Sequence, residues 1–113
     1  MAYDEYLAER IEIFLKDSNI SFEKKRMMGG LCFMVDDKLC MCVSKDRLLA
    51  RINPNLHEKS LKIKGCSELN ITGKPMIGFF FVEAFAVDLD KDLEHWINLC
   101  LEFNPKAKRS RKS

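Results

Sequence analysis

Long apolar segments are missing from this sequence. No run approaches the ~20 residues that a membrane-spanning helix requires, and the first ten residues, MAYDEYLAER, are acidic where a secretory signal peptide is basic and then apolar. The 113 residues also contain no internal repeat and no interdomain linker. These absences predict one domain that resides in the cytoplasm and makes no contact with a membrane.

Cysteine pairs of the CxxC type are also missing. The sequence has five cysteines without regular spacing, at positions Cys32, Cys40, Cys42, Cys66 and Cys100. Such a pattern favours free thiols in a reducing compartment over a disulfide framework. Cys40 and Cys42 lie two positions apart on an expected strand and should share one face, where a third ligand would complete a zinc site. Because no second closely spaced pair of Cys or His is present, we expect both to pack as small hydrophobic side chains, with no metal and no cofactor.

Catalytic side chains are sparse. Each of the two histidines, His57 and His95, lacks a nucleophile nearby in the sequence, and no serine lies in a nucleophile-elbow context. A thiol in an apolar strand has a raised pKa, so Cys40 and Cys42 should be poor nucleophiles. The sequence therefore predicts a protein that is not an enzyme. The alternative is a small enzyme or ligand-binding domain with a pocket near Cys40, Cys42 and His57.

The composition that remains is that of a globular domain with a charged tail. Hydrophobic residues make up 47% and charged residues 32% of the chain, whose net charge is +2. The last ten residues, NPKAKRSRKS, carry five basic side chains and no acidic one, which leaves 14 basic against 17 acidic residues elsewhere. We therefore predict a folded domain over residues 1–103 and a disordered basic tail over residues 104–113. The tail should serve solubility, and weak, non-specific contact with nucleic-acid phosphates is the alternative.

Two segments have the apolar period of amphipathic helices. Residues 3–18 repeat apolar side chains at helical spacing, Asn19 marks the helix end, and Tyr6 and Ile13 widen the apolar stripe enough to touch a partner. The second helix opens with the acidic stretch DLDKD, which suits the helix dipole. The expected buried stripes are Tyr3, Leu7, Ile11, Phe14 and Leu15 in the first helix, and Leu89, Leu93, Trp96, Ile97, Cys100 and Phe103 in the second.

The apolar segments LCFMV and KLCMCV flank Asp36-Asp37 and predict a β-hairpin with a two-residue turn. If Val35 pairs with Lys38, simple alternation assigns every side chain of the hairpin to a face. It places Leu31, Phe33, Val35, Cys40 and Cys42 on one face, and Cys32, Met34, Leu39, Met41 and Val43 on the other. Since both faces are apolar, the hairpin should lie centrally in a sheet and be covered on both sides, or face a partner subunit.

Further strands and one short helix follow this hairpin. We expect the strand RLLARI after the turn SKD, then a helix from Pro54 to about Ile63 that is capped by Asn53 and ended by Gly65. A weak strand, ELNI, the turn TGKP and a strongly apolar strand, MIGFFFVEAFAV, complete the segment before the last helix.

Gly29-Gly30, within KKRMMGGLCFMVDD, raises the alternative of a phosphate-binding loop. Such a loop places glycines between a strand and a helix N-terminus, where free N–H groups meet the anion. Here a strand follows the glycines, and the Gly-Lys-Ser/Thr of a P-loop is missing. A bulge or tight bend between two strand segments explains the pair better, and one of the two glycines should adopt backbone angles closed to other residues.

Three segments resemble the N-terminal domain of the TfoX/Sxy family: MAYDEYLAERI, KRMMGGLCFMVDDKLCMCVSKDRLLARI and TGKPMIGFFFV. The family's middle motif consists of two basic residues, Met-Phe-Gly-Gly, an apolar strand, an Asn-Gly-type turn and Lys. Met28 stands where the family usually has Phe, and Asp36-Asp37 replaces the Asn-Gly turn. The residues that match the family, as structural positions or partner contacts, are Lys25, Arg26, Met27, Gly29, Gly30, Phe33, Lys38, Gly73 and Pro75.

The resemblance implies a two-layer α+β fold in the order α-β-β-β-α-β-β-α, with an antiparallel sheet, flanking helices and a likeness to type III secretion chaperones. Residues 24–35 would then form one strand that bends at the glycine pair. Two-domain members of the family regulate natural competence with the cyclic-AMP receptor protein, and they carry a helical C-terminal domain that these 113 residues do not include. Together with the doubly apolar hairpin and the sparse catalytic side chains, the resemblance predicts a cytoplasmic bacterial regulatory domain, without catalysis, that binds a protein partner. We expect that partner to be the transcription machinery or a second copy of the chain.

Overall fold

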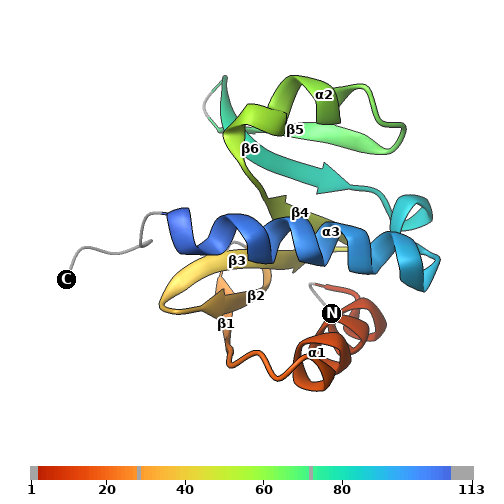
Figure 1. Ribbon diagram of the computed structural model, residues 1–113. Helices are drawn as coiled ribbons and strands as arrows, with labels where there is room; N and C mark the ends of the chain where they lie inside the picture. The colour runs from red at the N-terminus through yellow and green to blue at the C-terminus, as the bar shows by residue number, and fades with distance from the viewer. Residues whose placement is uncertain (1–2, 28, 72, 108–113) are drawn as a thin grey trace.

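The computed structural model describes residues 3–27, 29–71 and 73–107 and contains one six-stranded sheet flanked by helices (Figure 1). The strands are β1 (Glu23–Met27), β2 (Gly30–Val35), β3 (Lys38–Ser44), β4 (Arg47–Arg51), β5 (Cys66–Ile71) and β6 (Lys74–Val82). Their order is β1-β2-β3-β4-β6-β5, and every neighbouring pair is antiparallel. This is the α+β architecture that the family resemblance implies. Among the described residues, no helix is long and apolar enough to cross a membrane.

Helices precede, interrupt and follow the run of strands. The α-helices are α1 (Glu5–Asp17), α2 (His57–Leu61) and α3 (Asp90–Phe103), and short 3-10 helices lie at Pro54–Leu56, Ala84–Val87 and Asn104–Lys106. The Asp4 carboxylate caps α1 by accepting hydrogen bonds from the N–H groups of Tyr6 and Leu7. Asn19 follows the end of α1 with a φ of 59°, in the left-handed region that commonly ends helices. Asn53 caps the 3-10 helix before α2, as its sequence predicts.

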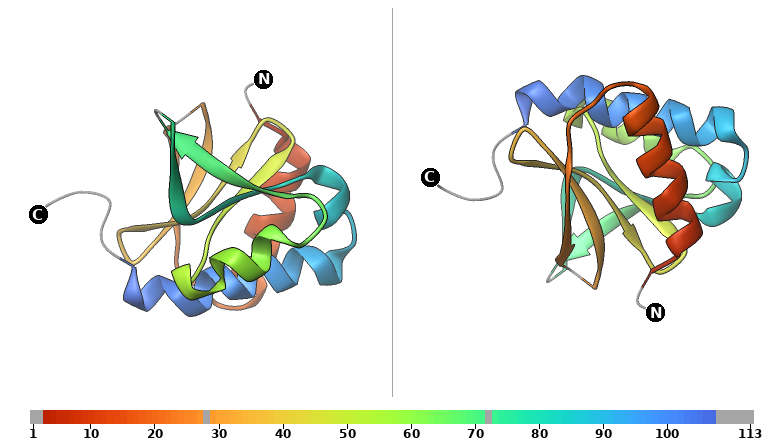
Figure 2. Two further views of the ribbon diagram at one scale, coloured as in Figure 1. Left: turned by 90° about the horizontal axis from the view of Figure 1, so that it is seen from above. Right: turned by 90° about the horizontal axis from the view of Figure 1, so that it is seen from below.

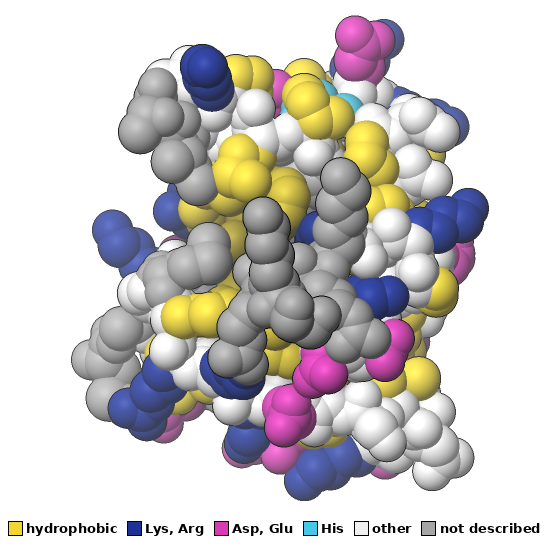
Figure 3. All heavy atoms as spheres, turned by 90° about the vertical axis from the view of Figure 1, so that its left-hand side faces the viewer, with side chains coloured by type: hydrophobic (Ala, Val, Ile, Leu, Met, Phe, Trp, Pro, Cys, Tyr) yellow, Lys and Arg dark blue, Asp and Glu magenta, His cyan; other side chains and the backbone are white. Residues whose placement is uncertain are grey.

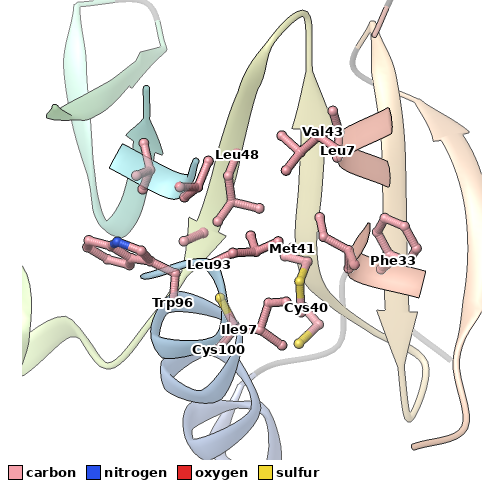
Figure 4. Close-up of a cluster of buried hydrophobic side chains, with 14 of the residues drawn as sticks. Leu7, Phe33, Cys40, Met41, Val43, Leu48, Leu93, Trp96, Ile97 and Cys100 are labelled. Carbon is pink, nitrogen blue, oxygen red and sulfur yellow. The ribbon is translucent and has the colours of Figure 1, made fainter. Parts of the chain in front are cut away.

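The main core lies between the helices and one face of the sheet. Ile11 of α1 and Ile97 of α3 are fully buried in one cluster with Phe33 of β2 and Phe80 of β6. Figure 4 shows the side chains of α3 pointing into this layer toward β3 and β4. Both α1 and α3 therefore cover the same face of the sheet, which the views in Figure 2 also show.

The other face of the sheet is concave and buries a second apolar cluster. Its buried members are Cys32, Met34, Leu39, Cys42, Leu49 and Leu69. Met27 of β1 and Phe81 of β6 pack against them. Because Met27 of β1 and Leu69 of β5, the two edge strands, line one cavity on this face, the sheet curls until its two ends approach each other. The β2–β3 hairpin is therefore central and covered on both faces, as its two apolar faces predict.

A β-bulge in β3 changes the predicted faces of this hairpin. The register shifts by one residue between Phe33 and Met34, which leaves Cys40 as the extra residue of β3. Beyond the bulge, Met41 packs with the helices and Cys42 lies on the concave face. The prediction that Cys40 and Cys42 share a face is wrong, because alternation is reliable only in a strand without a bulge.

Two other segments differ from expectation. Residues 24–35 form two antiparallel strands joined by a turn at the glycine pair, where one bent strand was expected. The apolar run that begins in β6 leaves the sheet after Val82, and residues 84–87 form a 3-10 helix, because an apolar run alone does not separate a strand from a helical turn. Leu89, expected in the buried stripe of α3, precedes the helix and is 56% exposed.

The folded part of the chain extends past the predicted boundary at residue 103. Asn104 and Ala107 are buried, and the 3-10 helix Asn104–Lys106 continues directly from α3. Residues 104–107 therefore pack with the domain, although they were assigned to the disordered tail. The rest of the predicted tail, residues 108–113, lies outside the described residues.

Candidate functional site

Of the motif glycines, Gly29 lies in the tight connection between β1 and β2, and Gly30 is the first residue of β2. Gly29 has a φ of 74°, in the left-handed region that glycine adopts at little cost. A Cβ atom at Gly30 would overlap the carbonyl oxygen of Val43, so this glycine lets β2 lie close to β3. A strand follows the pair, and the loop therefore lacks the helix N-terminus that a phosphate site of this type needs. The prediction that one of the two glycines adopts backbone angles closed to other residues is confirmed, although the bend is a turn between two paired strands and not a kink within one strand.

The basic motif residues lie on β1, an edge strand. Lys25 pairs with Cys32 and Arg26 with Leu31, and both basic side chains are exposed. Charged side chains on an edge strand oppose pairing with another chain. Met27, at the end of the strand, is half-buried against the concave cluster.

Three further motif residues have structural positions. Phe33 is fully buried, and its ring centroid lies 5.8 Å from that of Phe22. Gly73 lies in the connection between β5 and β6 with a φ of 81°. Pro75 pairs with Asn70 and is exposed. These contacts explain the residue types by packing and turn geometry.

Lys38, the last residue of the middle motif, connects the β2–β3 hairpin to the end of α3. Its Nζ donates hydrogen bonds to the carbonyl oxygens of Asn104 and Pro105, each at 3.2 Å. The Asn104 amide donates in return to the carbonyl oxygen of Val35, at 3.2 Å. The ammonium group thus lies at the carbonyl end of the helix, where the dipole favours a cation, and shares the Asn104 carbonyl oxygen with the N–H of Ala107. Figure 3 shows this side of the molecule, where hydrophobic side chains gather among Lys and Arg side chains.

The bulge in β3 brings Cys42 opposite Cys32, and the two residues form a disulfide on the concave face. Their Cα atoms are 4.0 Å apart, and neither side chain is more than 2% exposed. The prediction of five free thiols is therefore wrong for this pair. Cys42 also lines a cavity of about 230 Å³, whose walls include Gly30, Leu49 and Phe81.

Two arginines of β4 lie over aromatic rings of β6. The guanidinium carbon of Arg47 is 3.9 Å from the ring centroid of Phe81, and that of Arg51 is 5.3 Å from the ring centroid of Phe79. Arg51 also donates a hydrogen bond to the carbonyl oxygen of Leu39, and its burial lowers its pKa. These cations sit above the apolar cluster and cover part of it with their stems.

The residues of the alternative small-molecule pocket do not come together. Cys42 lines the concave cavity, whereas Cys40 lies on the opposite face of the sheet, in the layer against α3 (Figure 4). His57 is buried elsewhere, with Nε2 2.7 Å from a carboxylate oxygen of Glu68 and Nδ1 accepting a hydrogen bond from the N–H of Gly78 at 3.0 Å. Because Nδ1 accepts, Nε2 carries the proton that it donates to Glu68. Both ring nitrogens of His57 are thus occupied by the fold.

Burial lowers the reactivity of the free thiols, because it raises their pKa values. It raises the pKa of Cys40 to about 12 and that of Cys66 to about 11. The pKa of Cys100 lies well above its usual range, first because of burial and then because of the nearby Cys40. A nucleophile or zinc ligand needs the thiolate, which these sites disfavour. Within the part of the chain that the structure describes, no three His, Cys, Asp or Glu side chains form a group able to hold a metal ion.

An exposed apolar surface lies where α1 meets the start of α3. We call it the α1–α3 surface and define it by Tyr6 (70% exposed), Ile13 (51%) and Leu89 (56%). Arg10 joins the two elements through a 3.0 Å ion pair with Asp90, and its guanidinium carbon lies 5.8 Å from the ring centroid of Tyr6. Tyr6 and Ile13 are seven positions apart on α1, so they project from the same side of that helix.

A curled antiparallel sheet, helices packed on one of its faces and a lysine-anchored hairpin define a small single-sheet α+β domain. Residues 19–104 match the family model of the TfoX N-terminal domain. The chain belongs to this family. The match includes every motif residue from Lys25 to Pro75, which confirms the resemblance seen in the sequence. No curated protein and no solved structure matches the chain.

Sequence reasoning missed Arg10, Asn104 and the Cys32–Cys42 pair. Arg10 contacts residues about 80 positions away, so no local pattern reveals its role. Asn104 did have a signal, because an Asn-Pro pair directly after a helical stripe marks a helix end, but the cations that follow favour assignment to a tail. The disulfide could be predicted from the sequence only by assuming a bulge in β3, which places Cys42 opposite Cys32.

Proposed function

We propose that this TfoX N-terminal domain is a protein-interaction module of a bacterial regulatory system in the cytoplasm, and that it binds its partner through the α1–α3 surface. The observation that carries the proposal is the exposure of Tyr6, Ile13 and Leu89 around Arg10, which lies against the Tyr6 ring and binds Asp88 and Asp90 on either side of Leu89. Single exposed apolar side chains are normal, but a group of them is typical of an interaction site. Tyrosine is also among the residues enriched in such sites.

The α1–α3 surface is held in one arrangement before a partner binds. Arg10 is 15% exposed and holds both α1 and the start of α3, donating to the carbonyl oxygen of Asp88 and to the carboxylate of Asp90. Tyr6 and Leu89 are therefore presented by two elements that are fixed relative to each other. A preformed surface loses little conformational freedom when it binds.

The regulatory part of the proposal rests on the family. Two-domain TfoX proteins act with the cyclic-AMP receptor protein at promoters, and we propose a partner from the transcription machinery for this domain. A second copy of the chain is the alternative partner. We propose no catalysis, since His57 is engaged at both nitrogens and the pKa values of the free thiols are raised by burial.

The regulatory role is tested by transcript levels in the organism that encodes the protein. Deletion of the gene should change a defined set of transcripts, and the parent sequence supplied in trans should restore them. A Tyr6→Asp/Leu89→Asp variant should fold but should not restore them, because two carboxylates oppose burial of the surface. Ile77→Asp is the matched control, since Ile77 is also exposed (52%) but lies on β6. Restoration by the surface variant would contradict the proposal.

The partner is identified by photocrosslinking in cells. A photoreactive phenylalanine analogue in place of Tyr6 should give a crosslinked species that is missing when the analogue replaces Ile77. Mass spectrometry then shows whether the captured chain belongs to the transcription machinery or is a second copy of this domain. Equal crosslinking from both positions would mean that the α1–α3 surface is not a preferred site.

A further inference from the structure

The concave cavity borders one residue of the disulfide, Cys42, and not the other, Cys32. Its volume is about 230 Å³, and Cys42 is one of its wall residues together with Gly30, Leu49, Leu69 and Phe81. The wall does not include Cys32, which is completely buried. The other β3 residues in this wall are Val43 and Ser44. A small reagent that enters the cavity would therefore meet Cys42 first.

Positive charge lies beside this cavity. Lys25 pairs directly with Cys32 across β1 and β2, and paired residues in antiparallel strands project on the same face. The exposed Lys25 ammonium group is therefore on the concave side. Arg47 lies over Phe81 of the cavity wall, although Glu83 pairs with it at 3.8 Å. Such charges raise the local concentration of an anionic reagent.

We propose that the Cys32–Cys42 disulfide is a thiol–disulfide exchange site that is entered through this cavity, and that its reagent is a low-molecular-weight thiol bearing carboxylates, of the glutathione class. The inference rests on the cytoplasmic setting of the proposed function, where such thiols are abundant and most protein disulfides are transient. Cys42 is the sulfur that is attacked, and Cys32 is the leaving group.

The exchange is balanced in two steps. A reagent thiolate attacks Sγ of Cys42, the disulfide breaks, and the electron pair leaves with Sγ of Cys32, which takes up a proton. The carbonyl oxygen of Met27 lies 3.8 Å from this sulfur and can accept a hydrogen bond from the new thiol. A second reagent thiolate then attacks the reagent's sulfur in this mixed disulfide, and the electron pair leaves with Sγ of Cys42, which takes up a proton. Two reagent thiols are thereby oxidised to one disulfide, while the protein disulfide is reduced to two thiols.

The order of attack is tested with two variants and one reagent. Cys32→Ser leaves a thiol at Cys42 in the cavity wall, and Cys42→Ser leaves a thiol at the buried Cys32. With glutathione disulfide as the probe, peptide mapping should show adduct formation at Cys42 at least about tenfold faster than at Cys32, since both residues are buried but only Cys42 borders the cavity. A ratio near one, or faster reaction at Cys32, would overturn the proposal.

The parent protein provides a measurement that does not depend on the folding of these variants. After brief treatment with reduced glutathione, remaining thiols are alkylated and the peptides are mapped. Glutathione should be found on Cys42 and the alkylating group on Cys32. The opposite distribution, or no mixed disulfide while unfolded protein is readily reduced, would overturn the proposal.

The charge of the reagent is tested with Lys25→Glu. Reduction by glutathione should slow by about threefold or more, whereas reduction by the neutral 2-mercaptoethanol should not change. Lys59→Glu, on α2, is the control and should affect neither reagent. If Lys25→Glu slowed reduction by both reagents equally, the proposal that the site prefers an anionic thiol would be overturned. These assays use purified protein alone, so their failure is distinguishable from failure of the proposed regulatory function.

Discussion

The Lys38 ammonium group donates a hydrogen bond to the carbonyl oxygen of Asn104, which lies 66 positions later in the chain. The contact joins the start of β3 to the end of α3, and the Lys38 side chain is only 11% exposed. Asp36 lies 3.6 Å from the same ammonium group but is itself 69% exposed. The buried contacts to the helix end therefore matter more for stability than this screened ion pair.

Lys38→Met should lower the free energy of unfolding by roughly 1–3 kcal/mol, because it removes the buried hydrogen bonds to the carbonyl oxygens of Asn104 and Pro105, of which Asn104 keeps only the N–H of Ala107. Urea denaturation followed by circular dichroism measures the change. Lys59→Met, at an exposed position of α2, is the control and should change little. Equal stability of the two variants would mean that the contact of Lys38 with Asn104 contributes nothing.

Alanine substitutions should distinguish the roles of the two motif glycines. Gly30→Ala should destabilise by more than about 1 kcal/mol, because the new Cβ overlaps the carbonyl oxygen of Val43. In Gly29→Ala the new Cβ meets no other atom, so the substitution should lower the free energy of unfolding by only about 1 kcal/mol, which is the cost of the positive φ. Gly73→Ala, also at positive φ in open space, should resemble Gly29→Ala in the same denaturation experiment. If Gly30→Ala unfolds like the parent, the close approach of β2 to β3 is not a constraint.

Thiol titration should report the state of all five cysteines. In guanidinium without reductant three thiols should react with Ellman's reagent, from Cys40, Cys66 and Cys100, and five should react after reduction. In the native protein the half-buried Cys66 should react first. Its pKa of about 11 leaves little thiolate at neutral pH, so its rate should rise about tenfold per pH unit until the pH nears that value. Five reactive thiols without reductant would contradict the disulfide.

Nucleic-acid binding, if present, should depend on the basic residues after Ala107. A gel-shift titration compares the full chain with a version that ends at Ala107, because a cut at Phe103 would also remove the acceptors of Lys38. When the full chain binds duplex DNA through the four cations that the shorter chain lacks, a plot of log affinity against log salt concentration should have a slope of roughly −4. We expect weak binding by the full chain, without sequence preference, and none by the shorter chain. Selective binding by the shorter chain would contradict this and direct attention to Lys25 and Arg26.

Local sequence signals determined most of the secondary structure. The period of apolar residues predicted α1 and α3, Asn19 marked the end of α1, and Asp36-Asp37 predicted the hairpin turn, where both residues have positive φ. The glycine pair predicted a bend and the family motif predicted the α+β class. These features depend on backbone preferences and on burial of one face, which neighbouring residues specify by themselves.

Tertiary structure alone decided which side chains meet. One extra residue at Cys40 moves Cys42 to the concave face and opposite Cys32, and alternation along the strand cannot show this. Small twists between neighbouring strands add up over the six strands and make the sheet curl, which brings Met27 and Leu69 to one cavity. The contacts of Lys38 and Arg10 join elements that are distant in the chain. Such contacts are selected by packing of the whole domain, so no local pattern contains them.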